Sequence, residues 1–133
     1  MIVNDGRLIE VDEMDIKLLD KNPEKFWEDI KYIDNYAFGG CTNLSIIKIP
    51  DGVETIGDYA FNGCTNLTKI EIPNSVKSIG KYAFYGCTYL ASIEILDGLE
   101  TIGDYGFNGC ANLTNIEIPD SVKTIGDYAF NEC

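Results

Sequence analysis

Histidine is absent from the 133-residue sequence, and without it neither a Cys-His pair nor a Ser-His-Asp triad can form. The phosphate-binding motif G-x-x-x-x-G-K-[ST] is also missing. Acidic residues are plentiful, but no pair of them is flanked by the apolar pocket residues that would raise a carboxyl pKa for acid–base work. The sequence therefore predicts a protein without catalytic residues, metal site or cofactor, and so not an enzyme.

Basic residues are few, because 10 lysines and arginines stand against 22 aspartates and glutamates, for a formal net charge of −12. Such a chain repels nucleic acids and anionic membranes and favours basic or neutral partners, although an acidic surface also serves plain solubility. No apolar run reaches the about 18 residues needed to cross a bilayer, so no membrane insertion is expected. Residues 1–7 lack the basic and apolar regions of a signal peptide, which predicts a cytoplasmic protein if the chain is complete.

One pattern recurs along most of the chain with a fixed period of 23 residues. Its copies begin at Ile33, Ile56, Ile79, Ile102 and Ile125. The chain is 45% hydrophobic, which is ample for a core, but so short a unit cannot bury its own apolar face. The period therefore predicts a solenoid of four full repeats and a partial fifth over residues 33–133.

Each repeat contains two segments with strand character. The longer one has the spacing L-x-x-I-x-I, in which the isoleucines alternate with period two and indicate a strand with one buried face. Proline follows this segment in three copies and ends the ladder, whereas Leu96 in the third copy predicts a slightly longer strand. An Asp-Gly or Asn/Asp-Ser turn and a second, shorter strand come next. The longer strands are expected at residues 44–49, 67–72, 90–95 and 113–118.

A compact turn, Tyr-Ala-Phe-Asn-Gly-Cys at residues 59–64, closes the repeat and is expected to form a single helical or 3₁₀ turn. Stacking would place equivalent side chains roughly 5 Å apart, which predicts ladders of identical residues. The expected ladders are Phe38, Phe61, Phe84, Phe107 and Phe130; Tyr36, Tyr59, Tyr82, Tyr105 and Tyr128; and Cys41, Cys64, Cys87, Cys110 and Cys133. The tyrosines are expected to be mainly structural, with an aromatic binding strip as the alternative.

Three roles are open to the five cysteines. A zinc site needs ligands clustered as in C-x-x-C, which a 23-residue spacing does not supply. Disulfides need Cβ atoms about 3.5–4.5 Å apart, closer than parallel side chains on adjacent coils would be. The sequence therefore predicts a column of buried thiols that act as small hydrophobes. Cys133 is expected to be exposed and able to bridge to another chain.

Residues 1–32 do not fit the repeat register and predict a cap over the first repeat, made of a hairpin and a short helix. Asp5-Gly6 suits the positive φ of a hairpin turn. Residues 11–18 have helical spacing, although alternation leaves a strand open. An Asn-Pro pair suits the start of a short helix over residues 23–31. Trp27 is expected to cover the end of the stack, and a ligand platform is the alternative.

The repeat resembles the BspA-type leucine-rich repeats, a bacterial and protozoal class with units of the same length. The shared residues are the Ile-Gly-x-x-Ala-Phe-x-x-Cys block, the Leu-x-x-Ile-x-Ile-Pro strand and the following Val-x-x-Ile, and they cover residues 33–133. The resemblance implies a right-handed leucine-rich-repeat solenoid, mainly β with short helical turns and a parallel sheet. It also implies protein recognition or adhesion, at a cell surface or after secretion, although a scaffold does not define its ligand.

The solvent face of the longer strands is the candidate surface for a protein partner. Its outward positions form two columns, and three glutamates stacked in one column repel one another, which suits a basic partner or a cation. A tolerated, solvated charge column is the alternative. The candidate partner-binding residues are Ile46, Lys48, Lys69, Glu71, Ser92, Glu94, Asn115 and Glu117.

Two further features concern the assembly of the coils. Glu54, Lys77, Glu100 and Lys123 occupy equivalent positions, so charge alternates along the stack and is expected to fix its register. Nothing near Cys133 resembles a cap, which predicts an open last coil. The chain is thus expected to be a fragment of a longer array, or a structural element that forms a homodimer through this end.

Overall fold

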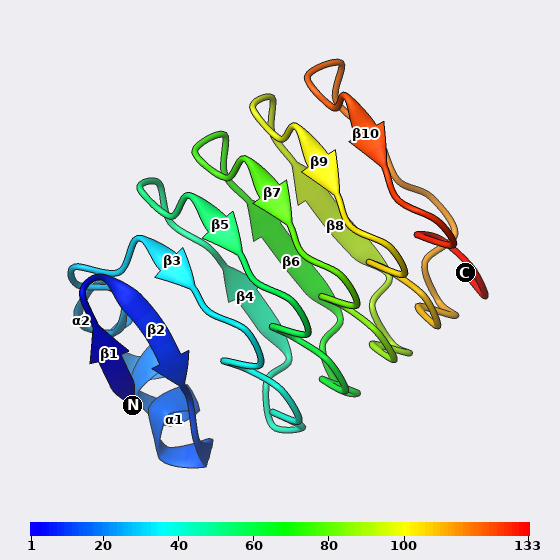
Figure 1. Ribbon diagram of the computed structural model, residues 1–133. Helices are drawn as coiled ribbons and strands as arrows, with labels where there is room; N and C mark the ends of the chain where they lie inside the picture. The colour runs from blue at the N-terminus through cyan, green and yellow to red at the C-terminus, as the bar shows by residue number, and fades with distance from the viewer.

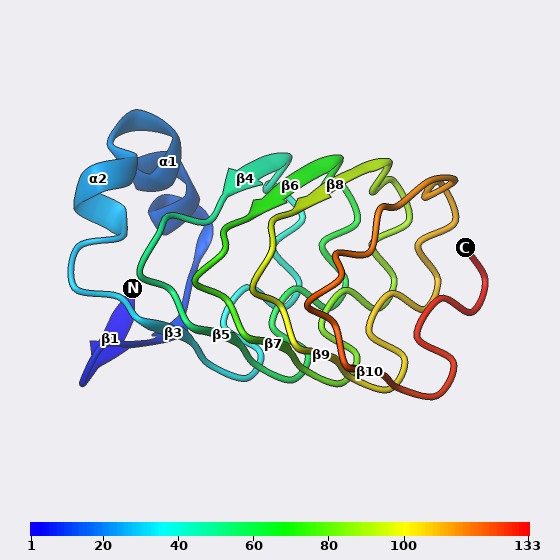
Figure 2. The same ribbon diagram turned by 90° about the horizontal axis from the view of Figure 1, so that it is seen from above.

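The computed structural model describes residues 1–133, and from residue 33 onward the chain forms a row of coils with one 23-residue repeat to each turn (Figure 1). The two helices lie together at the N-terminal end of the row, and neither is long and apolar enough to cross a membrane (Figure 2). The elements are β1 (Ile2–Asn4), β2 (Arg7–Glu10), α1 (Glu13–Lys21), α2 (Pro23–Phe26), β3 (Tyr32–Ile33), β4 (Ile46–Lys48), β5 (Thr55–Ile56), β6 (Lys69–Ile72), β7 (Ser78–Ile79), β8 (Ser92–Ile95), β9 (Thr101–Ile102) and β10 (Thr124–Ile125).

Two sheets run along opposite sides of the row (Figure 2). The shorter strands give the more extensive sheet, with the order β1-β2-β3-β5-β7-β9-β10, and the longer strands give a second sheet, β4-β6-β8. Between repeats the strands are parallel, and each residue pairs with its equivalent, as Ile33 does with Ile56 and Ile47 with Ile70. The predicted mainly β solenoid is confirmed, with a longer and a shorter strand in each of the first three coils.

The N-terminal segment joins the first coil through backbone hydrogen bonds and apolar contacts. The hairpin is formed by β1 and β2 around Asp5 and Gly6, which both have positive φ, and β2 pairs in parallel with β3. The helical interpretation of residues 11–18 is confirmed by α1, which begins at a capping box. One core of 34 buried residues extends from Leu8 to Ala129, so the division between residues 1–32 and 33–133 stays a prediction.

Stacked phenylalanines fill the centre of the coils, as the sequence predicts. Ring centroids from Phe38 to Phe130 follow one another at 4.8–5.3 Å, with ring planes within 7° of parallel. Such a ring buries on the order of 150–250 Å² and dominates the packing of its coil. Trp27 is 7% exposed and lies 6.2 Å from the Phe38 ring, so its predicted place over the end of the stack is confirmed.

The predicted helical turn over residues 59–64 is wrong, because the chain makes a series of non-helical turns there. Alternate N–H groups donate within the repeat and to the next repeat: Phe61 N–H bonds Ala83 C=O at 2.7 Å, whereas Asn62 N–H bonds Tyr59 C=O at 3.0 Å. Tyr59 has a φ of 58°, in the left-handed region, and its four equivalents share that conformation. A left-handed residue at this point prevents a right-handed helix from forming.

The predicted strand over residues 113–118 is also wrong, and the longer-strand sheet stops at β8. No backbone N–H of residues 113–118 bonds to the preceding coil, and the last such bond before the segment is from Asn112 N–H to Thr88 C=O at 3.2 Å. Pairing in register would bring Glu117 against Glu94, and no ion pair neutralises either carboxylate. Just after β8, Leu96 N–H does donate to Ile72 C=O at 3.2 Å, but β8 is no longer than β6.

The alternating charges form an ion pair at one of the three places where neighbouring repeats bring them together. Lys123 Nζ lies 3.1 Å from Glu100 Oε1, whereas Glu54 and Lys77 form no ion pair. The neighbouring turns add a second link between the same repeats, because Gly98 N–H donates to Ser121 Oγ at 3.0 Å. Gly52 and Ser75 repeat that bond at 3.1 Å. These contacts favour the in-register stacking of adjacent coils.

A column of Asn and Asp side chains links the coils at the bend after each shorter strand. Asn35 Oδ1 accepts from Asp58 N–H, Asp58 Oδ1 from Lys81 N–H, and Asp104 Oδ1 from Asp127 N–H, each at 2.8 Å. A Cβ on Gly57 would lie 2.6 Å from Asn35 Oδ1, which explains the glycine there. Lys81 interrupts the column because it offers no oxygen, and Asp104 N–H donates to no protein group.

We expect Lys81→Asn to restore this missing bond and to raise the free energy of unfolding by about 1 kcal/mol relative to Lys81→Ala. Both variants remove the same exposed charge, so the difference between them isolates the hydrogen bond. Urea denaturation followed by circular dichroism provides the measurement. Equal stabilities of the two variants would show that the side-chain column does not stabilise the stack.

Candidate functional site

The predicted partner-binding face is the outer surface of β4, β6 and β8. Its first column pairs Ile46 with Lys69 and Lys69 with Ser92, and its second column pairs Lys48 with Glu71 and Glu71 with Glu94. The structure thus brings six of the eight candidate residues together in two in-register columns. Period-two alternation explains why all of them point outward while Ile47, Ile70 and Ile93 face the core.

Asn115 and Glu117, the two remaining candidates, lie beside this sheet and not within it. Both are exposed, and together with Ile93, Glu94, Ile95 and Ile116 they line a hollow of about 190 Å³. The isoleucines that the repeat pattern assigns to the core, Ile116 and Ile118, are only half-buried. The column of glutamates therefore continues past β8 with Glu117, which lies on a segment that does not pair with the sheet.

The charge on this face is distributed unevenly. Glu71 is held by two lysines, with Lys69 Nζ 3.4 Å from Oε1 and Lys48 Nζ 3.8 Å from Oε2. Exposed pairs of this kind stabilise weakly but do cancel local charge. Glu94 and Glu117 have no such lysine. The unneutralised negative charge of the face thus lies in the third and fourth repeats.

A cleft of about 250 Å³ opens where β4, β6 and β8 end. Its apolar surface comes from Pro50, Pro73 and Leu96, and its acidic wall from Glu71 and Glu94. Sequence reasoning did not include the two prolines and the leucine in the site. The signal that could have found them is the break in the repeat at Leu96, where a leucine that is 45% exposed replaces proline. The other lining residues are Lys48, Ile49, Asp51 and Ile72.

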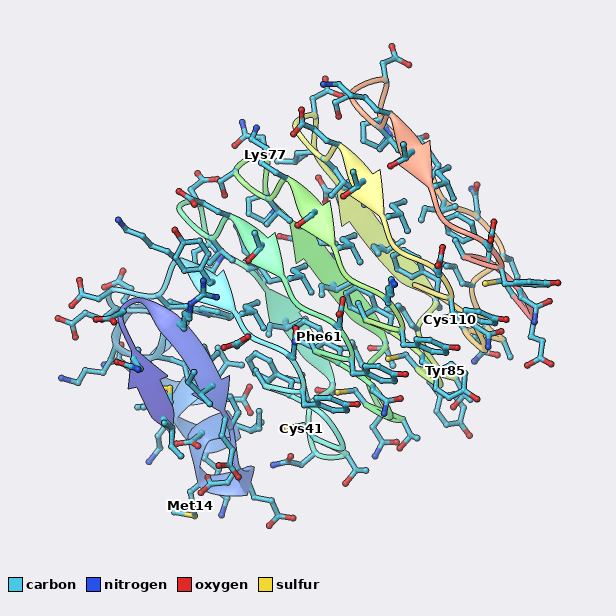
Figure 3. The ribbon with its side chains drawn as sticks, in the orientation of Figure 1. Met14, Cys41, Phe61, Lys77, Tyr85 and Cys110 are labelled. Atoms are coloured by element: carbon cyan, nitrogen blue, oxygen red, sulfur yellow. The ribbon has the colours of Figure 1, made fainter.

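The tyrosine ladder is a stacked column, with centroid separations of 4.7–5.1 Å from Tyr36 to Tyr128. Desolvation in the stack, with the neighbouring tyrosines, raises the pKa of Tyr59 and Tyr105 above the usual value. Because the rings cover each other's faces, the column presents ring edges to solvent, as expected for structural tyrosines. Tyr85, at the outer edge of its coil, is 41% exposed and packs edge-on against Tyr82 (Figure 3).

The five cysteines are all free, which confirms the predicted column of reduced thiols. Each thiol of Cys64, Cys87 and Cys110 donates to the carbonyl of the phenylalanine 26 residues earlier, over 3.1–3.3 Å. Burial raises the pKa of Cys64 and Cys110 to about 12, which disfavours the reactive thiolate. Cys133 is exposed, as expected, and no three His, Cys, Asp or Glu residues group into a possible metal site.

Comparison with known families gives a match over most of the chain. The model described as "BspA type Leucine rich repeat region (6 copies)" matches residues 24–133. Comparison with the curated proteins gives no match.

The solved structures that resemble this chain are bacterial leucine-rich-repeat proteins. A T. pallidum Leucine Rich Repeat protein is 38% identical with a TM-score of 0.77, and the match covers 78% of this chain and 49% of that one. One from Bacteroides ovatus is 46% identical with a TM-score of 0.71, over 77% of this chain and 26% of that one. A leucine rich cell surface protein from Faecalibacterium prausnitzii is 29% identical with a TM-score of 0.57, over 79% and 35%. This chain thus spans about half the length of these proteins or less.

The thiol column makes stability depend on pH in the alkaline range. Both states keep the proton below pH 9, the ordinary thiol pKa. Between pH 9 and about 12 the unfolded chain loses the proton that the folded Cys64 and Cys110 retain. The free energy of unfolding should therefore fall as pH rises, by up to about 1.4 kcal/mol per pH unit for each thiol.

Denaturation at several pH values between 8 and 11 checks this expectation. A Cys64→Ala/Cys110→Ala variant should show a flatter dependence, because tyrosine and lysine titration is common to both proteins. If the two slopes coincide, the thiols do not contribute to the alkaline loss of stability.

Proposed function

Because the chain belongs to the BspA-type leucine-rich-repeat family, we propose that it is a non-enzymatic scaffold for protein recognition or adhesion. The partner binds on the outer face of β4, β6 and β8. The observation that supports this proposal is that six candidate residues recur there in register, and that Glu94, which is one of them, and Glu117, beside the sheet, have no lysine partner. Unneutralised carboxylates on a chain of charge −12 favour a basic protein partner.

A cell-surface or secreted location is part of this proposal. It is supported by the family and by one relative, which is described as a leucine rich cell surface protein. Adhesion requires a rigid face that presents the same geometry to each partner. The stacked coils supply that rigidity, since each strand of the face is bonded to the next in register.

Charge reversal tests the proposed face. The triple variant Glu71→Lys/Glu94→Lys/Glu117→Lys changes the net charge by +6, from −12 to −6. The matched control Glu10→Lys/Asp20→Lys/Glu28→Lys makes the same change at exposed residues of the N-terminal segment. We expect the face variant to bind an oligolysine peptide about tenfold more weakly than the control, as measured by isothermal titration calorimetry. Equal affinities would mean that net charge alone attracts basic partners.

Self-association is a second candidate function, supported by apolar surface on the last coil. Ile125 is 48% exposed and Tyr128 is 63% exposed. Nearby, a cleft of about 460 Å³ is lined by apolar residues that include Leu113 and Phe130. Contact between two such surfaces would bury this area in a homodimer. The chain would then act as a structural element that assembles through residues 125–133.

Sedimentation velocity over a range of concentrations tests this second candidate. We expect a concentration-dependent dimer, which Ile125→Asp dissociates by placing a charge in the contact. Ile46→Asp, at a position on the opposite sheet that is 59% exposed, serves as the control and should leave the dimer unchanged. A protein that stays monomeric at high concentration would rule out this assembly.

A further inference from the structure

Leu96 departs from the repeat pattern in a way that the fold does not require. The equivalent residues are Pro50, Pro73 and Pro119. Pro73 is buried, whereas the leucine side chain is 45% exposed. The other three copies form this turn with proline, so the stacking of the coils does not by itself explain why a leucine is present here. The substitution places an aliphatic side chain on the outer face, in line with Ser92 and Glu94.

The surroundings of Leu96 combine two kinds of chemistry. Pro50, which is half-buried, and the buried Pro73 also line the cleft, at the ends of β4 and β6. Glu94 lies on the same side of β8, two residues before Leu96, and has no lysine partner. The cleft therefore offers an apolar floor immediately beside an unneutralised carboxylate.

The size and charge of the cleft limit its occupant. At about 250 Å³ it is smaller than the 300–1,000 Å³ typical of pockets that enclose a small molecule, and it suits one or two side chains. Acidic ligands are repelled by Glu94 and Asp51, which form no ion pair, and a second copy of this chain would bring further negative charge to the face. A basic residue next to an apolar one satisfies both parts of the cleft.

We propose that this cleft binds an extended segment of a protein partner in which an apolar side chain stands next to a lysine or arginine. The apolar side chain packs on Leu96 and the two prolines, and the cation meets Glu94. This proposal rests on the proposed recognition function and specifies the partner motif. Leu96 then contributes affinity by burying the part of its side chain that the free protein exposes.

A peptide titration followed by NMR of the ¹⁵N-labelled protein tests the proposal. The probe is the blocked peptide Gly-Lys-Leu-Lys-Gly, compared with Gly-Lys-Ser-Lys-Gly and Gly-Glu-Leu-Glu-Gly. We expect amide shifts at Glu71, Glu94 and Leu96, and affinity about fivefold lower for the serine peptide. The glutamate peptide should not bind. Shifts that avoid these residues, or equal affinity for all three peptides, would overturn the proposal.

Leu96→Pro is the matched protein variant, because the other repeats carry proline at this position. We expect it to bind the leucine peptide about fivefold more weakly and to discriminate no longer between the leucine and serine peptides. If Leu96→Pro retains full affinity while the Glu71/Glu94/Glu117 reversal removes it, the cleft proposal fails and the proposed function stands. If neither variant weakens binding, or if the lysine peptides do not bind at millimolar concentration, both fail.

Discussion

The bond between each residue and its own equivalent in the next coil is the constraint on which the rest of the structure depends. Parallel pairing in both sheets and the alternate N–H groups of the compact turns all follow one register. The same register places phenylalanine on phenylalanine and thiol beside thiol. Because no coil can bury its own apolar face, stability comes from contacts between neighbours. A substitution is therefore felt mainly in two adjacent coils.

Identical stacking is favourable for aromatic rings and unfavourable for like charges, and the chain departs from repetition where charges would meet. Lys48 and Lys69 flank Glu71, and Lys81 interrupts a column of aspartates at the cost of one hydrogen bond. At Glu94 and Glu117 no lysine intervenes, and there the longer-strand sheet ends. The surface that remains charged is the one for which we propose a partner. Stability and recognition thus compete at the same positions.

The period of the sequence was sufficient to predict the coils, the parallel strands, the phenylalanine and cysteine columns and six of the eight face residues in register. The period did not predict the structure correctly where equivalent residues adopt different conformations or where the conformation is unusual for the residue type. Residues 113–118 carry the strand pattern but lack a neutralised partner strand, and Tyr59 adopts a left-handed conformation that no propensity favours. The cleft at Leu96 was missed because the loss of proline there was interpreted only as an extension of the strand. A deviation from the repeat that exposes an apolar side chain, as at Leu96, can instead indicate a candidate binding site.

The tryptophan and the tyrosines are distributed so that they report on different parts of the row. The sole tryptophan lies against Phe38, at the C-terminal end of α2, whereas stacked tyrosines run the length of the coils. Indole emission should consequently report on the N-terminal end, and phenol absorption and exciton-coupled circular dichroism on the array as a whole. The wild-type protein thereby contains two native chromophores that distinguish fraying from global melting without any added label.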